Sequence, residues 1–184
     1  MIEIYSMTWI VAIFFAVIGT IRGWSKELVS LAGIILAMFA LFQFDSLLRG
    51  VLLASVPHDQ AFFVQVGLFG VIVYFAYQTR APGVRGGSGG GERGGPRRNR
   101  WQDAILGGLM GALNGYLIWG AVWYFLDIND YPLAPLIIAP APGGISDRNL
   151  GTIPLVLLGG AAGGSTEVLT IIVIVLFLFV LFML

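Results

Sequence analysis

Cysteine is absent from the 184 residues, and charged residues are scarce at 11%. Without cysteine the chain has no disulfide, no thiolate metal site and no cysteine nucleophile. The single histidine excludes haem ligation by two histidines of this chain. Soluble domains carry about 25% charged residues, so a water-exposed globular surface is also excluded. Apolar residues are abundant instead, at 58% with a mean hydropathy of +0.89, which is typical of an integral membrane protein.

Charged residues divide the chain into five uncharged apolar stretches. A membrane-spanning helix needs about 20 mostly apolar residues. The stretches are Ile4–Ile21, Leu28–Phe44, Gln60–Thr79, Ala104–Leu126 and Val168–Leu184. We therefore expect an all-α integral membrane protein, with a bundle of four transmembrane helices and a fifth C-terminal transmembrane helix. Because no ionisable Asp, Glu, Lys, Arg or His falls within these stretches, pumps and ion-coupled transporters are disfavoured.

The distribution of Lys and Arg predicts the orientation. Segments 22–27 and 80–103 hold eight of the ten basic residues against three acids, whereas the remaining connections hold two basic residues and seven acids. Since basic loops stay in the cytoplasm, the N-terminus is expected outside and the C-terminus inside. The predicted organisation is a four-helix module at 1–127 with a Gly/Arg-rich cytoplasmic loop at 81–100. A Pro/Gly-rich extracytoplasmic segment at 128–166 and the fifth helix at 167–184 follow it.

Within the extracytoplasmic segment, the apolar run Leu150–Gly164 is too short to span a membrane by itself. Its glycine pairs interrupt it, and Pro154 is a favourable residue for a helix start. We expect a short helix there, and the sequence leaves open whether this helix lies on the membrane surface or re-enters the membrane.

Small residues recur every four positions in the fourth stretch, which puts them on one face of a helix. Missing side chains on such a face allow another backbone to approach closely. The face consists of Gly107, Gly111 and Gly115, flanked by Ala104, Gly108 and Ala112. It either binds a partner protein or, as we favour, packs against other helices of the same chain.

Two groups of charged residues are expected near the cytoplasmic boundary. The first is Arg22, Lys26, Glu27 and Asp103, for which we favour a structural ion-pair cluster over a purely topological role. The second is Arg97, Arg98 and Arg100 beside Trp101, a pattern that fits contact with anionic lipids. Phosphate loops, zinc motifs and serine nucleophile elbows are missing. We therefore expect no enzymatic activity, no metal or cofactor, no nucleic-acid binding and no small-molecule substrate.

Two segments resemble the colicin V production protein (CvpA) family of small bacterial inner-membrane proteins. The first, Ile21–Leu31, is similar to the family's Arg-Gly-aromatic-x-basic-Glu-x-x-Ser signature. The second begins at Asp103, continues through the small-residue face and ends at Asp127. Together they cover roughly residues 4–127. Asn114 stands where family members commonly have an Arg. The resemblance implies a four-helix module in the bacterial inner membrane, linked by name to colicin V production and hence to toxin biosynthesis.

Two functions remain open at this point. We favour a non-catalytic, cofactor-free accessory or scaffold subunit that docks on other membrane proteins of a larger complex, for which a photosynthetic or respiratory complex is one candidate host. The alternative is an envelope or secretion factor of the colicin V production type, of which an oligomeric pore is one form. A pore needs a polar lining, for which the helices offer Gln43, Gln65, Gln78 and Asn114.

Overall fold

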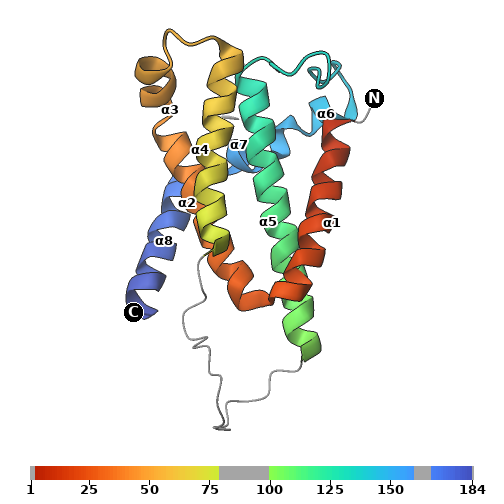
Figure 1. Cartoon of the computed structure of the whole chain (residues 1–184), viewed down its shortest axis with the longest axis vertical. Helices are drawn as coiled ribbons and strands as arrows, with labels where there is room; N and C mark the ends of the chain where they lie inside the picture. The colour runs from red at the N-terminus through yellow and green to blue at the C-terminus, as the bar shows by residue number, and fades with distance from the viewer. Residues whose placement is uncertain (1–2, 79–99, 160–166, 184) are drawn as a thin grey trace.

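Four long helices form the frame of the molecule. The computed structural model describes residues 3–78, 100–159 and 167–183, which contain helices and turns but no strand. The four are α1 (Ile4–Arg22), α2 (Trp24–Gln43), α4 (His58–Gln78) and α5 (Arg100–Ile128). Figure 1 shows them running along a common direction, with the N-terminus at one end of the bundle. Each is long and apolar enough to cross a membrane, so the predicted four-helix membrane bundle is confirmed and the protein is a multi-pass membrane protein.

A single residue, Gly23, connects α1 to α2. Its φ of 83° lies in the left-handed region, where a side chain is strained. A Cβ at this position would also lie only 2.8 Å from the Asp103 Oδ2 atom of α5. Glycine therefore makes the turn tight enough to hold the last residue of α1 against the first turn of α2. We call this end of the bundle the Gly23 end and the opposite end the Ile4 end.

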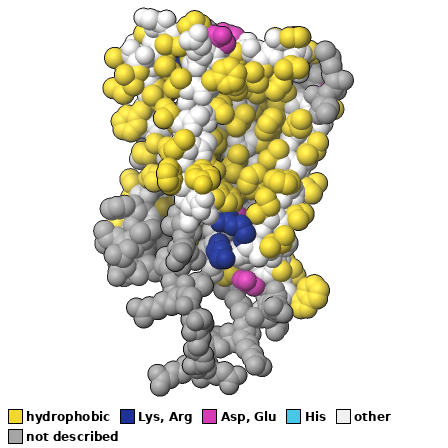
Figure 2. Space-filling view, in the orientation of Figure 1, with side chains coloured by type: hydrophobic (Ala, Val, Ile, Leu, Met, Phe, Trp, Pro, Cys, Tyr) yellow, Lys and Arg dark blue, Asp and Glu magenta, His cyan; other side chains and the backbone are white. Residues whose placement is uncertain are grey.

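The core and the exterior of the bundle are both apolar. Inside, Ile34 and Met38 of α2 are fully buried, and Phe69 of α4 packs edge-on against Phe125 of α5 with ring centroids 5.9 Å apart. Outside, hydrophobic side chains cover most of the visible face, and the Lys and Arg side chains that can be seen on this face lie toward the Gly23 end (Figure 2). An apolar exterior is what hydrocarbon contact requires of a spanning bundle.

Short elements at the Ile4 end cover the bundle. The three-residue helix α3 (Asp45–Leu47) continues into the π-helical turn η1 (Leu48–Leu52), and Arg49 makes a bidentate ion pair with Asp45 at 2.7 and 2.8 Å. This hydrogen-bonded carboxylate raises the pKa of Arg49. On the other side, α6 (Ile145–Arg148) joins α1 through a hydrogen bond from the Tyr5 backbone N–H to the Ser146 hydroxyl.

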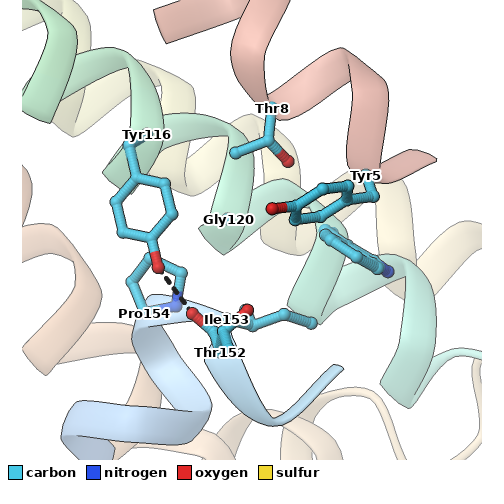
Figure 3. A pocket seen from close by; sticks show the side chains of 8 residues that line it. Tyr5, Thr8, Tyr116, Gly120, Thr152, Ile153 and Pro154 are labelled. Atoms are coloured by element: carbon cyan, nitrogen blue, oxygen red, sulfur yellow. Dashed lines mark hydrogen bonds between the residues drawn. The ribbon is translucent and has the colours of Figure 1, made fainter. Parts of the chain in front are cut away.

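A short helix, α7 (Pro154–Gly159), lies among the spanning helices rather than on the surface. The chain reaches it through the 3-10 turn η2 (Leu150–Thr152). Tyr116 of α5 donates a hydrogen bond to the Thr152 carbonyl, and the Pro154 ring fills the space above Gly120, where a Cβ would overlap it (Figure 3). Pro154 is buried, and so is Leu155 at 0% exposure. The predicted short helix is present, and its burial between α5 and α2 favours re-entry over a surface position.

The predicted C-terminal helix is α8 (Glu167–Met183), 17 residues long. It packs along α2 and against α7, and it ends toward the Gly23 end of the bundle (Figure 1). Its Leu169 side chain is 1% exposed. In Figure 1, α8 begins part-way along the bundle and not at the Ile4 end. Because α8 continues from the level of α7 and not from the Ile4 end, a full crossing by α8 alone stays a prediction.

Candidate functional site

A buried ion pair at the Gly23 end is the most polar feature inside the bundle. The Arg22 Nη1 atom lies 2.6 Å from the Glu27 Oε1 atom. The Glu27 side chain is completely buried, whereas that of Arg22 is 21% exposed. The Gly23 turn creates this contact, because it brings the end of α1 over the first turn of α2. A carboxylate without water needs such a partner, since an isolated charge in an apolar interior is strongly destabilising.

Asn114 from the middle of α5 completes the coordination of Glu27. Its Nδ2 atom donates to the Glu27 Oε2 atom at 2.7 Å and to the Glu27 backbone carbonyl at 3.1 Å. Asn114 is fully buried, and its Oδ1 atom has no hydrogen-bond partner among the described residues. The amide group of Asn114 therefore points its N–H donors toward the Glu27 carboxylate.

Two further groups hold the Arg22 guanidinium in place. Its Nη2 atom donates to the Tyr77 carbonyl of α4 at 2.8 Å, and its Nη1 atom donates to the Ser30 hydroxyl at 3.3 Å. The guanidinium carbon also lies 4.4 Å from the centre of the Tyr77 ring, a cation–π arrangement. Side chains or carbonyls from α1, α2, α4 and α5 thus meet at one point. We call Arg22, Glu27, Ser30, Tyr77 and Asn114 the central cluster.

The structure changes the sequence-based interpretation of the charges at this end. Glu27 was expected outside the apolar stretches, but α2 begins at Trp24 and buries it in the bundle interior. Of the predicted partners, Arg22 pairs with Glu27, whereas Lys26 is exposed and belongs to neither of the two ion pairs seen among the described residues. The Asp103 carboxylate lies against Gly23, beside the turn and not in the ion pair. No pattern in the sequence indicated that Asn114, Ser30 and Tyr77 would join this group.

The small-residue face of α5 lies against α1. A Cβ added at Gly107 would overlap the Gly19 carbonyl, one at Gly111 would overlap the Phe15 carbonyl, and one at Gly115 would lie 2.7 Å from the Val11 carbonyl. Gly108 faces the Thr20 side chain, while Ala104 and Ala112 are half-buried beside this face. The two helices touch backbone to backbone, the arrangement that small residues permit in membranes.

The predicted lipid-binding arginines fall largely outside the described residues. Arg97 and Arg98 lie there entirely, and Arg100 is the first residue of α5. Their neighbour Trp101 is 81% exposed at the Gly23 end of α5, where an aromatic ring favours the membrane boundary. No contact that would identify a lipid site is described for these three arginines, so the patch stays a prediction.

Tyr131 ties the Ile4 end of α5 to the loop that follows it. Its hydroxyl donates to the Asp127 Oδ1 atom at 3.0 Å and accepts from the Trp123 Nε1 atom at 3.3 Å. Burial of the phenol raises the pKa of Tyr131. It remains a neutral donor to Asp127 throughout the physiological pH range.

The charged and polar groups of the central cluster satisfy one another and connect four helices. Its charges neutralise each other, and no group of three or more His, Asp or Glu able to hold a metal ion occurs among the described residues. The Arg22–Glu27 ion pair also makes hydrogen bonds with Ser30, Tyr77 and Asn114. Each of the four helices supplies a polar group whose partners lie on the others, so these contacts fix how the helices pack. The expected function of the cluster is therefore to specify the packing of the module.

Replacing Asn114 by Leu is expected to lower the free energy of unfolding by about 1–3 kcal/mol, because the Glu27 Oε2 atom loses the shorter of its two hydrogen bonds and keeps only the one from the Tyr77 hydroxyl at 3.4 Å. Asn114→Asp, which has nearly the same shape, should be more harmful at neutral pH, since it places a second carboxylate beside Glu27. Thermal unfolding of the purified chain measures both. Equal stability of the wild type and both variants would show that the Asn114–Glu27 contact is absent.

Comparison with known proteins gives one family. The family described as colicin V production protein matches residues 7–138. This range includes α2, α4 and α5 and all of α1 after its first three residues, and it extends past Asp127 into the proline-containing loop, further than the resemblance in the sequence had indicated. The elements α6, α7 and α8 lie beyond it. No curated protein and no solved structure matches the chain significantly.

Proposed function

The chain belongs to the colicin V production protein family, and from that premise we propose that it is an envelope protein that supports toxin production or secretion in the bacterial inner membrane. It acts without catalysis or cofactor, through its four-helix module. The observation that carries this proposal is the match of the family to 7–138, the part of the chain that the central cluster holds together.

The family match favours the envelope factor over the docking subunit of a larger complex. Colicin V production is the role that the family's description names, whereas no comparison supports a photosynthetic or respiratory host. The small-residue face, one of the surfaces that a partner protein could have used, is already occupied by α1 within the same chain, as we favoured from the sequence. Any partner of this protein must therefore use its exposed apolar helices or its ends.

A water-filled pore through this module is not part of the proposal. Gln65 and Asn114, two of the polar residues available as a lining, are 2% and 0% exposed and are engaged inside the bundle. Gln65 accepts a hydrogen bond from Asn129 at 2.7 Å. Gln65 is thus paired with Asn129 and Asn114 with Glu27, inside the bundle. An oligomer of this chain would therefore present mostly apolar surfaces to its centre, which disfavours ion flow.

Complementation tests the proposed function. A colicin V-producing strain that lacks its own family member is given this chain, and the toxin released is measured by growth inhibition of a sensitive strain. We expect toxin release to be restored by the wild type and by Gly67→Leu, an exposed substitution on α4. A chain that is inserted at the normal level but restores nothing would refute the proposal. If the purified chain conducted ions and Asn114→Leu abolished the conductance, the statement that the module forms no pore would be refuted.

The proposed orientation places the Gly23 end in the cytoplasm, where its basic residues also contact anionic lipids. Ser25 is exposed in the first turn of α2, Ser46 is exposed in α3 just beyond the other end of α2, and the chain has no cysteine of its own. We expect Ser25→Cys to react with a membrane-impermeant thiol reagent only after the membrane is opened, and Ser46→Cys to react in intact spheroplasts. The reverse labelling pattern would show that the topology is the opposite of the one proposed. Labelling of both cysteine variants in intact spheroplasts would contradict the placement of these two positions on opposite sides of the membrane.

A further inference from the structure

A cavity of about 460 Å³ lies at the Ile4 end between α1, α5 and the loop that precedes α6. Its volume falls within the range of about 300–1,000 Å³ that is usual for small-molecule sites. Ile4 and Met7 of α1, Trp119 of α5 and the loop residues 136–141 form its walls. The Trp119 indole donates to the Ile4 carbonyl at 3.2 Å, which closes the gap between α1 and α5 at the cavity wall.

Apolar side chains around the cavity are open to the surroundings. Leu136 is 90% exposed and Ile138 is 46% exposed, and both line the cavity. The cavity also lies where α1 begins, at the level at which a spanning helix enters the membrane. Exposed apolar residues beside an interfacial Trp are typical of the boundary between headgroups and acyl chains. An apolar chain of an amphiphile therefore fits this environment better than a water-soluble ligand does.

One charged side chain, Glu3, is found among the described residues that line the cavity. Although Glu3 caps α1 with its backbone carbonyl, its side chain makes no capping hydrogen bond. It takes part in neither of the ion pairs seen among the described residues, and no described Lys or Arg lines the cavity. The mouth of an apolar cavity thus carries a carboxylate that is available to a cation.

We propose that this cavity binds an ammonium-bearing amphiphile, with its apolar chain against Trp119 and its ammonium group at Glu3. The bilayer supplies such a molecule as phosphatidylethanolamine, and a soluble alkylammonium has the same chemistry. The position at the membrane boundary favours the phospholipid. The proposal depends on the geometry of the cavity and not on the role in toxin production.

Fluorescence quenching of Trp119 tests this site directly. The full chain, with its other four tryptophans replaced by Phe, is placed in phosphatidylglycerol vesicles that contain either phosphatidylethanolamine or phosphatidylglycerol with brominated chains. We expect brominated phosphatidylethanolamine to quench at about two- to fivefold lower mole fraction, the effect of one exposed ion pair. Glu3→Gln should remove this preference, whereas Asp59→Asn, a change of another acid at the Ile4 end, should preserve it. If the quadruple variant does not fold, the Trp119 signal is taken as the difference between wild type and Trp119→Phe.

A soluble bromoalkylammonium added to the same vesicles separates the two sources. Quenching by brominated phosphatidylethanolamine that depends on Glu3 supports the lipid as occupant. Quenching that depends on Glu3 only for the alkylammonium supports the ammonium site with a soluble ligand. Equal quenching by both lipids with no effect of Glu3→Gln on any probe would overturn the proposal.

Discussion

Replacing Arg22 by Ala should lower the free energy of unfolding by about 3–5 kcal/mol, because it leaves the completely buried Glu27 carboxylate without its cation. The remaining donors, the Asn114 amide and the Tyr77 hydroxyl, are neutral and cannot compensate the charge. The variant is expected to extract poorly from the membrane and to unfold at a much lower temperature. Thermal unfolding of the purified chain in mild detergent measures the loss.

The matched control removes both charges at once. In the double variant Arg22→Met with Glu27→Met, no unpaired charge remains, and replacement of a buried ion pair by apolar residues is often close to neutral. We therefore expect the double variant to be more stable than Arg22→Ala. If both variants were equally unstable, the cost would come from lost packing at the Gly23 turn and not from the isolated carboxylate.

Replacing Gly111 by Leu should separate α1 from α5. Even a Cβ at this position overlaps the Phe15 backbone carbonyl and lies 3.0 Å from the Gly19 Cα atom, and neither backbone atom can move without shifting the helix. Overpacking of this kind usually destabilises by about 1–3 kcal/mol, and the backbone contact places Gly111→Leu at or above the upper value. Size-exclusion chromatography and thermal unfolding of the extracted protein measure the loss of the native bundle.

Gly67 of α4 provides the control for this substitution. It is exposed, and no atom lies within 4 Å of the Cβ that a side chain would add there. Gly67→Leu introduces the same side chain into a spanning helix without a clash, so it should behave like the wild type or slightly better, since Leu favours helix over Gly. Equal damage by both substitutions would mean that Gly111 does not face α1.

Much of the frame could be predicted from the sequence because charges mark the ends of membrane helices. The four apolar stretches correspond to α1, α2, α4 and α5 within a few residues. The largest differences are at the starts of α2 and α5, which begin at Trp24 and Arg100, each four residues before the predicted stretch. For α2 the difference has a physical cause. Lys26 and Glu27 were treated as boundary charges, but a carboxylate that has a cation and an amide as partners can enter the bundle.

The candidate site was only partly predictable. The sequence placed Arg22 and Glu27 in one predicted ion-pair cluster with Lys26 and Asp103, but it left open which of the three pairs with Glu27. It could not show that Asn114 meets Glu27, because that contact joins residues 87 positions apart and depends on how α5 rotates against α2. Likewise, the run around Pro154 predicted a short helix, but its insertion depended on the space above Gly120.

The central claim is that the small-residue face of α5 forms the internal seam with α1, so that the family module is closed on itself. A Cβ added at Gly108 would lie 2.8 Å from the Thr20 Cγ2 atom, so sulfur atoms at the two positions come within disulfide reach. Thr20→Cys with Gly108→Cys is therefore oxidised in native membranes and run on a non-reducing gel. The account predicts a cross-link within one chain, at monomer size, and none for Thr20→Cys with Gly67→Cys. A cross-linked dimer, or no cross-link in the first pair, would contradict it.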